Sequence, residues 1–171
     1  MKNPTRRVAR AVVLVAIGVA LAPFTSIPVG IAKINPTQHF VNVVAAVLLG
    51  PWWALVIAAV IGVIRNALGV GTLLAFPGGM IGAFLAGLAY RYLRNIYLAA
   101  VGEVIGTGML GALVSALIVA PVFMHKAMAL GLLVASFSGS SLLGAALGVL
   151  ALGVLARAGV VEWERRPASG G

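Results

Sequence analysis

The chain is a succession of long apolar segments that carry very little charge. Of its 171 residues, 62% are hydrophobic and only 9% are charged, whereas charged residues make up about a quarter of a typical soluble domain. Cysteine is absent, so neither a disulfide framework nor thiolate chemistry is available. We therefore expect an all-α integral membrane protein that forms a single domain over residues 1–171.

The apolar segments predict six transmembrane helices. The first follows a basic N-terminus and resembles a secretory signal peptide, but Pro23 directly follows the A-L-A triplet that would be cleaved, so we expect this helix to be retained. The second is short for a span, which needs about 20 residues. The fifth is expected to end before Pro121, and SFSGSS (136–141) is a candidate bend in the sixth. The predicted helices cover roughly 7–22, 37–49, 52–68, 78–92, 96–119 and 127–156.

The basic residues predict the orientation of these helices. The net charge is +9, and in a membrane protein an excess of Lys and Arg marks the cytoplasmic side. We therefore interpret the charge as a topology signal, with both termini cytoplasmic, and expect no nucleic-acid partner. The inner face then holds Lys2, Arg6, Arg7, Arg10, Arg91, Arg94, Arg157, Arg165 and Arg166, and the outer face or outer half holds Lys33, Arg65 and Lys126.

Small residues recur at four-residue spacing along several of the predicted helices. The chain has 22 glycines, and small residues let helices approach closely in lipid, where water drives little association. For the fourth to sixth helices we interpret these ridges as packing faces within the molecule. For the ridge of Ala16 and Ala20 on the first helix, two interpretations stay open: packing within the chain, or contact with a partner protein.

A few polar residues interrupt the apolar segments and need an explanation. A charged side chain in a bilayer is expensive, usually faces the protein interior and often marks function. Side chains that are three or four positions apart share one face of a helix, so these residues form three clusters. They are Gln38, His39 and Asn42 on the second helix, Arg65 and Asn66 on the third, and Glu103 and Thr107 on the fifth.

Two roles are open for the charged members of these clusters. Arg65 is long enough to cover most of the gap to Glu103, and such a buried ion pair would only fix the order of the helices. The alternative is ligand binding, which we favour for Glu103 and His39, while for Arg65 the two roles have equal weight. The sequence has no paired-carboxylate, metal-binding or nucleotide-binding motif, so we expect no enzyme, no cofactor and no metal.

Three segments are specific enough in combination to suggest a family. PTQHFVNVVAAVLLGPWWA, RNALGVGTLLAFPGGMIGAFLAGL and GEVIGTGMLGAL resemble the ThiW family, and the resemblance runs from about Val29 to Ser141. It implies a substrate-binding S component of an energy-coupling factor (ECF) vitamin transporter, with six helices and a ligand site that opens outward. It also implies a T subunit and two ATPase subunits as partners. The ridge of Ala16 and Ala20 would meet the T subunit, as AxxxA motifs do in other S components.

The resemblance further implies a ligand, the thiamine precursor hydroxyethylthiazole. This molecule is small and neutral, so a suitable pocket is mostly apolar with a few convergent polar groups. The polar clusters supply such groups, and Phe76 or Phe40 is a candidate to stack on the ring. We therefore expect a multi-pass protein of a prokaryotic plasma membrane that binds hydroxyethylthiazole. The alternatives are an S component for thiamine or another related vitamin, or a membrane scaffold that binds no small molecule.

Overall fold

The computed structural model describes residues 4–29 and 32–159; Lys2, Arg165 and Arg166 of the predicted inner face lie outside them. The described chain forms six helices, which confirms the all-α membrane fold predicted from the sequence. Helix five is continuous from Ile96 to Phe123 but is divided into α-helical and π-helical segments. The helices are α1 (Pro4–Thr25), α2 (Pro36–Leu49), α3 (Pro51–Ala67), α4 (Ala75–Leu93), the fifth helix with α5 (Ile96–Ile105), η1 (Gly106–Gly111), α6 (Ala112–Val114) and η2 (Ser115–Phe123), and α7 (Leu130–Arg157).

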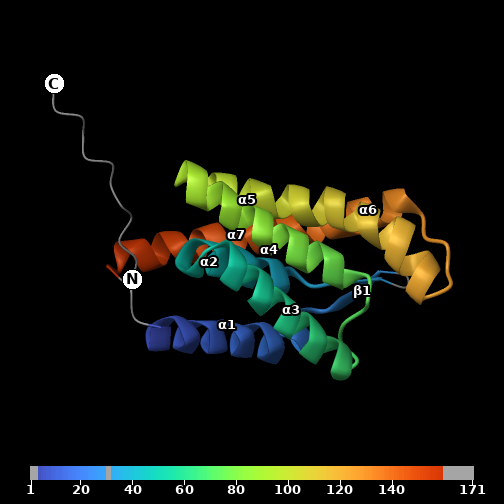
Figure 1. The fold of residues 1–171 in the computed structure, drawn as a ribbon, viewed down its shortest axis with the longest axis horizontal. Helices are drawn as coiled ribbons and strands as arrows, with labels where there is room; N and C mark the ends of the chain where they lie inside the picture. Colours follow the sequence, from blue (N-terminus) through green and yellow to red (C-terminus); the bar gives the residue numbers. More distant parts are fainter. Residues whose placement is uncertain (1–3, 30–31, 160–171) are drawn as a thin grey trace.

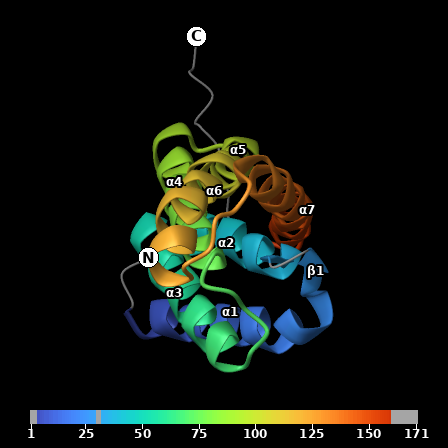
Figure 2. The same cartoon turned by 90° about the vertical axis from the view of Figure 1, so that its right-hand side faces the viewer.

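The helices run roughly side by side along the long axis of the molecule (Figure 1). Viewed end-on, α2 lies in the middle of the bundle (Figure 2), where it contacts α1, α3, α4, α5 and α7. Ten of its 14 residues are buried. A central position explains why α2 can carry polar side chains, because these side chains face other helices and not lipid.

Among the described residues, three helices are long and apolar enough to cross a membrane, judged by their length and composition. They are α1, the fifth helix and α7, and α2 and α3 are shorter apolar helices. The protein is therefore a membrane protein, as the sequence predicted. The end of the bundle where α2 begins is closed by a short antiparallel hairpin of β1 (Ile27–Val29) and β2 (Ala32–Ile34). The sequence predicts no strands between the first two helices, because strands of three residues give almost no periodic signal.

Four helices differ from the predicted boundaries. Helix α1 covers Pro4–Thr25 and so continues past Pro23, and α4 begins at Ala75 rather than near 78. The fifth helix does not end before Pro121 but continues to Phe123, because Pro121 lies within the π-helical segment η2. In an α-helix the ring of a proline clashes with the carbonyl group four residues before it. In a π turn each N–H instead bonds to the carbonyl five residues back, and the wider turn leaves room for the ring. The final helix begins at Leu130 rather than near 127 and runs through 136–141 without a break.

Helix α4 and the fifth helix pack with their backbones in contact. A Cβ atom on Gly106 would lie 2.6 Å from the Cα atom of Gly82, and one on Gly111 would collide with the Cα atom of Gly78. Any larger residue at these positions would push the two helices apart. This close approach places residues 103–107 directly beside α4 and α2, where the predicted polar clusters meet.

Candidate ligand-binding site

The predicted polar residues converge between α2, α3, α4 and the fifth helix. Asn35 precedes α2 as its N-cap, and its side-chain oxygen accepts a hydrogen bond from the Gln38 backbone N–H at 3.0 Å. Such a cap fixes the first turn of a helix, and Gln38 and His39 lie on that turn. All but one of the predicted polar residues are buried: Gln38, His39, Asn42, Arg65, Glu103 and Thr107. Asn66 is only partly buried.

Glu103 is the centre of this polar cluster and is completely buried. Its Oε1 atom lies 2.7 Å from Nδ1 of His39, and it accepts a hydrogen bond from Nδ2 of Asn42 at 3.0 Å. The Thr107 hydroxyl lies 3.0 Å from the same Oε1 atom and 2.9 Å from the Gly78 carbonyl oxygen, and its single proton serves one acceptor at a time. Hydrogen bonds to an ionised group are stronger than neutral ones, so the carboxylate ties α2 to the fifth helix.

Arg65 is not the partner of Glu103, so the ion pair considered from the sequence is not formed. Its Nη1 atom instead donates to Oε1 of Gln38 at 3.1 Å, and Nε2 of Gln38 donates to Oδ1 of Asn42 at 3.3 Å. Among residues 4–29 and 32–159, the side chain that lies within ion-pairing distance of Glu103 is that of His39, and this contact is an ion pair only when His39 is protonated. Arg65 is therefore linked to the carboxylate only through two amide side chains.

Three buried polar atoms have no hydrogen-bond partner among the described residues. Two are Nε and Nη2 of Arg65, a residue that is only 2% exposed, and the third is Oε2 of Glu103. Leaving a buried donor of a charged group unpaired costs free energy. Glu103 Oε2 lies against the backbone of Gly82, where a Cβ atom would come within 2.8 Å of it. The Arg65 donors, by contrast, belong to a side chain that lines a cavity, and are available to a ligand.

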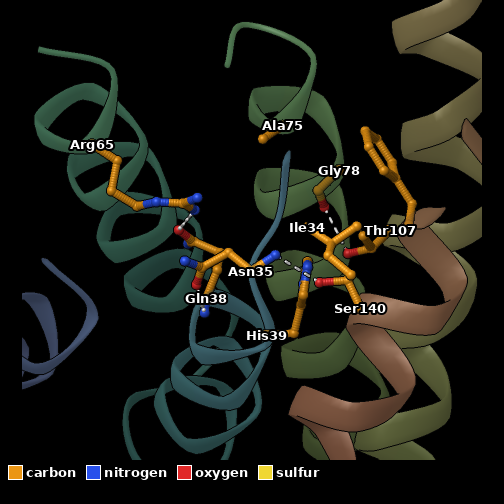
Figure 3. Close-up of a pocket in the computed structure, with 10 residues that line it drawn as sticks. Ile34, Asn35, Gln38, His39, Arg65, Ala75, Gly78, Thr107 and Ser140 are labelled. Atoms are coloured by element: carbon orange, nitrogen blue, oxygen red, sulfur yellow. Dashed lines mark hydrogen bonds between the residues drawn. The ribbon is translucent and has the colours of Figure 1, made fainter. Parts of the chain in front are cut away.

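The cavity lies at the end of the bundle where α2 begins (Figure 3). It has a volume of about 20 Å³, which is enough for one water molecule and less than a thiazole ring needs. A smaller space of about 10 Å³ lies beyond Arg65 and Gln38, which line both. The site is therefore closed in this structure, and its walls must move to admit a ligand. The main cavity is lined by Ile34, Asn35, Gln38, His39, Arg65, Ala75, Gly78, Thr107, Phe137 and Ser140.

The predicted site residues divide into three groups by position. Gln38, His39, Arg65 and Thr107 line the main cavity. Asn66 and Phe76 line only the smaller space. Asn42 and Glu103 line neither and instead hold the lining residues in place.

Some of the cavity lining was not predicted from the sequence. Asn35 donates its backbone N–H to Oγ of Ser140 at 2.9 Å and so ties the start of α2 to α7. The pair Asn35-Pro36 is a helix-start signal, which would have indicated a structural asparagine there. Phe137, which also lines the cavity, was not predicted either, although it is the one aromatic residue of α7.

The structure is similar to a solved S component of a bacterial ECF transporter, with a TM-score of 0.60 and 14% sequence identity, over 92% of this chain and 98% of that one. This likeness shows the fold. Residues 8–158 match the model of a family described as thiamine-precursor transporter protein, ThiW, and the chain belongs to this family. No match was found among curated proteins. The family resemblance of the sequence is thus confirmed.

Proposed function

We propose that the protein is the substrate-binding S component of an ECF-type importer and that it captures hydroxyethylthiazole at the cavity lined by Arg65 and His39. The observation that carries this proposal is the buried Arg65 side chain, whose Nε and Nη2 donors lack partners among the described residues. Membership of the thiamine-precursor transporter family supports the ligand class.

The polar groups of the cavity match those of the ligand. An ionised carboxylate only accepts hydrogen bonds, so Nδ1 of His39 carries the proton that faces Glu103, and Nε2 is left for the ligand. In a neutral ring Nε2 accepts a hydrogen bond from the ligand hydroxyl. The free donors of Arg65 bond to the hydroxyl oxygen or the ring nitrogen. Apolar contact for the thiazole ring comes from Ile34, Ala75 and Phe137. Phe76, which was predicted to stack on the ring, lines only the smaller space and would reach the ring only if that space joined the main cavity.

The distribution of charge supports capture from outside. The basic residues at the ends of α1, α4 and α7 lie at one end of the bundle, and the hairpin and the start of α2 lie at the other (Figure 1). Lys and Arg mark the cytoplasmic side, so the termini are cytoplasmic and the cavity lies near the outer face. The protein would then reside in the plasma membrane of a prokaryote. The described basic residues at the inner end are Arg6, Arg7, Arg10, Arg91, Arg94 and Arg157.

The ridge of Ala16 and Ala20 is the proposed contact with the T subunit. Both alanines are exposed, whereas α1 packs on the bundle through Ala11, Leu14, Gly18 and Ala22. The ridge therefore faces away from the rest of the chain and is free to pack against another helix. The T subunit and two ATPase subunits would supply the energy for delivery.

Ligand binding to the purified protein tests this function. We would titrate hydroxyethylthiazole, thiamine and the hydroxymethylpyrimidine precursor, and we expect hydroxyethylthiazole to bind most tightly, because its hydroxyl and ring nitrogen match the donors and acceptors that line the cavity. Preferential binding of thiamine would overturn the substrate but keep the S component. Binding of none of the three would contradict the transport function and favour a scaffold.

A further inference from the structure

Ser140 carries a hydroxyl group that the polar cluster around Glu103 does not use. This serine lies on α7, is 1% exposed and lines the main cavity. Its Oγ atom accepts a hydrogen bond from the backbone N–H of Asn35 at 2.9 Å. A serine hydroxyl also has one proton to donate, and among the described residues no group accepts that proton. The proton is therefore available to a ligand in the cavity.

His39 offers the complementary group to the same cavity. Its Nδ1 atom faces Glu103 at 2.7 Å, so in a neutral ring Nε2 carries no proton and accepts a hydrogen bond. In Figure 3 His39 and Ser140 lie on the side of the cavity toward α7, and Arg65 reaches in from α3 on the other side. One side of the cavity thus presents a donor and an acceptor, and the other presents the donors of Arg65.

The wall that carries His39 and Ser140 is closely packed. A Cβ atom on Gly144, about one turn after Ser140 on α7, would collide with the Pro36 carbonyl oxygen and lie 2.7 Å from Cβ of His39. Partners within the chain hold the two polar groups whether or not a ligand is present. Groups that are already in place when a ligand enters lower the entropic cost of binding.

We propose that Ser140 and His39 together recognise the hydroxyl group of the ligand, a role that rests on the proposed function and makes Ser140 a specificity-determining residue. The ligand hydroxyl donates its proton to Nε2 of His39, and its oxygen accepts the proton of Ser140. An alcohol has both capacities, whereas a carbonyl or ether oxygen only accepts and would leave Nε2 of His39 unpaired. The ring nitrogen of hydroxyethylthiazole lies away from its hydroxyl arm, and it binds the donors of Arg65.

Calorimetric titration of two ligands tests this role. They are hydroxyethylthiazole and its ethyl analogue, in which a hydrogen atom replaces the hydroxyl group. The unchanged chain should bind hydroxyethylthiazole on the order of 100-fold more tightly, because it makes two more hydrogen bonds that contribute roughly tenfold each. In Ser140→Ala this preference should fall to roughly tenfold, since the bond to His39 remains. The substitution also removes the acceptor of the Asn35 N–H, but that loss affects both ligands alike and cancels in the ratio of affinities.

Ser141→Ala is the matched control. Ser141 is buried on the same helix, donates to the Ser138 carbonyl oxygen at 3.2 Å and does not line the main cavity, so this variant should keep the full preference. An unchanged preference in Ser140→Ala, whether both affinities fall or neither does, would overturn the proposal and leave Ser140 as a residue that only positions Asn35. Equal binding of the two ligands by the unchanged chain would overturn it without any variant. If the unchanged chain bound neither ligand, the proposed function would fall as well.

Discussion

The two ends of this protein hold arginines in opposite ways. Arg65 lies beside a closed cavity of about 20 Å³, is 2% exposed and has one hydrogen-bond partner, the side chain of Gln38. At the other end Arg7, Arg91 and Arg94 are among the residues that line a larger cavity of about 280 Å³, which we call the arginine cavity. The free energy of a charge in a protein depends on what surrounds it. A change of charge at the ligand site should therefore affect stability and binding far more than a change at the arginine cavity.

Glu103→Ala should have the largest effect on stability. The substitution leaves His39 Nδ1 and Asn42 Nδ2 without their shared acceptor, and each buried donor that is left unpaired typically costs about 1–3 kcal/mol. Arg91→Ala, at the other end and exposed, should cost less than about 0.5 kcal/mol. Unfolding in detergent, followed by circular dichroism, would compare the two. Equal losses would show that the Glu103 cluster contributes no more than a surface charge.

Glu103→Gln separates the role of the charge from that of the hydrogen bonds. Its amide oxygen still accepts from His39 and Asn42, so we expect a smaller loss of stability than in Glu103→Ala. Ligand binding should weaken about tenfold, because the neutral side chain no longer holds the proton on Nδ1 of His39 as strongly. Calorimetry with hydroxyethylthiazole measures this. Unchanged affinity would show that Glu103 does not act on the ligand through His39.

Gly82→Ala should have an intermediate effect, and Gly79→Ala is its matched control on the same helix. A Cβ atom on Gly82 would collide with the Thr107 hydroxyl and lie 2.8 Å from Oε2 of Glu103, whereas a Cβ atom on Gly79 would lie 3.8 Å from Nε2 of Gln38. Overpacking of this kind costs about 1–3 kcal/mol, and an ordinary van der Waals contact costs almost nothing. Thermal unfolding of the two variants would test this, and equal melting temperatures would contradict the described packing.

Ala16→Leu/Ala20→Leu should have the smallest effect on the protein itself. Both residues are exposed, so stability and ligand binding should not change. Co-purification of the T subunit should fall, because the larger side chains keep the helices apart. Val12→Leu, which is also exposed on α1, serves as the control. Normal assembly of the double variant would exclude this ridge as the contact.

Much of the fold follows from the sequence, because apolar periodicity and proline positions are local signals. Glu103 stood out for the same reason, as a lone acid in an apolar segment. Its partner could not be predicted, because His39 and Glu103 are 64 residues apart and meet only through the position of α2 in the bundle. From the sequence, Arg65 was considered as the partner of Glu103, because its side chain is long enough to cover most of the gap between the two positions. Pro121 was misleading, because a π-helical segment relieves the clash that normally ends a helix.

The most direct test of the ligand site is a calorimetric titration of hydroxyethylthiazole into three purified proteins. They are the unchanged chain, Arg65→Met and Arg157→Met. The last is the control, because Arg157 lies at the opposite end of the bundle and lines neither space of the ligand site. Hydrogen bonds to a charged group contribute about 1.5–3 kcal/mol, so Arg65→Met should weaken binding on the order of 100-fold while remaining folded, and Arg157→Met should bind normally. Binding by Arg65→Met that equals that of the unchanged chain would contradict the proposed site.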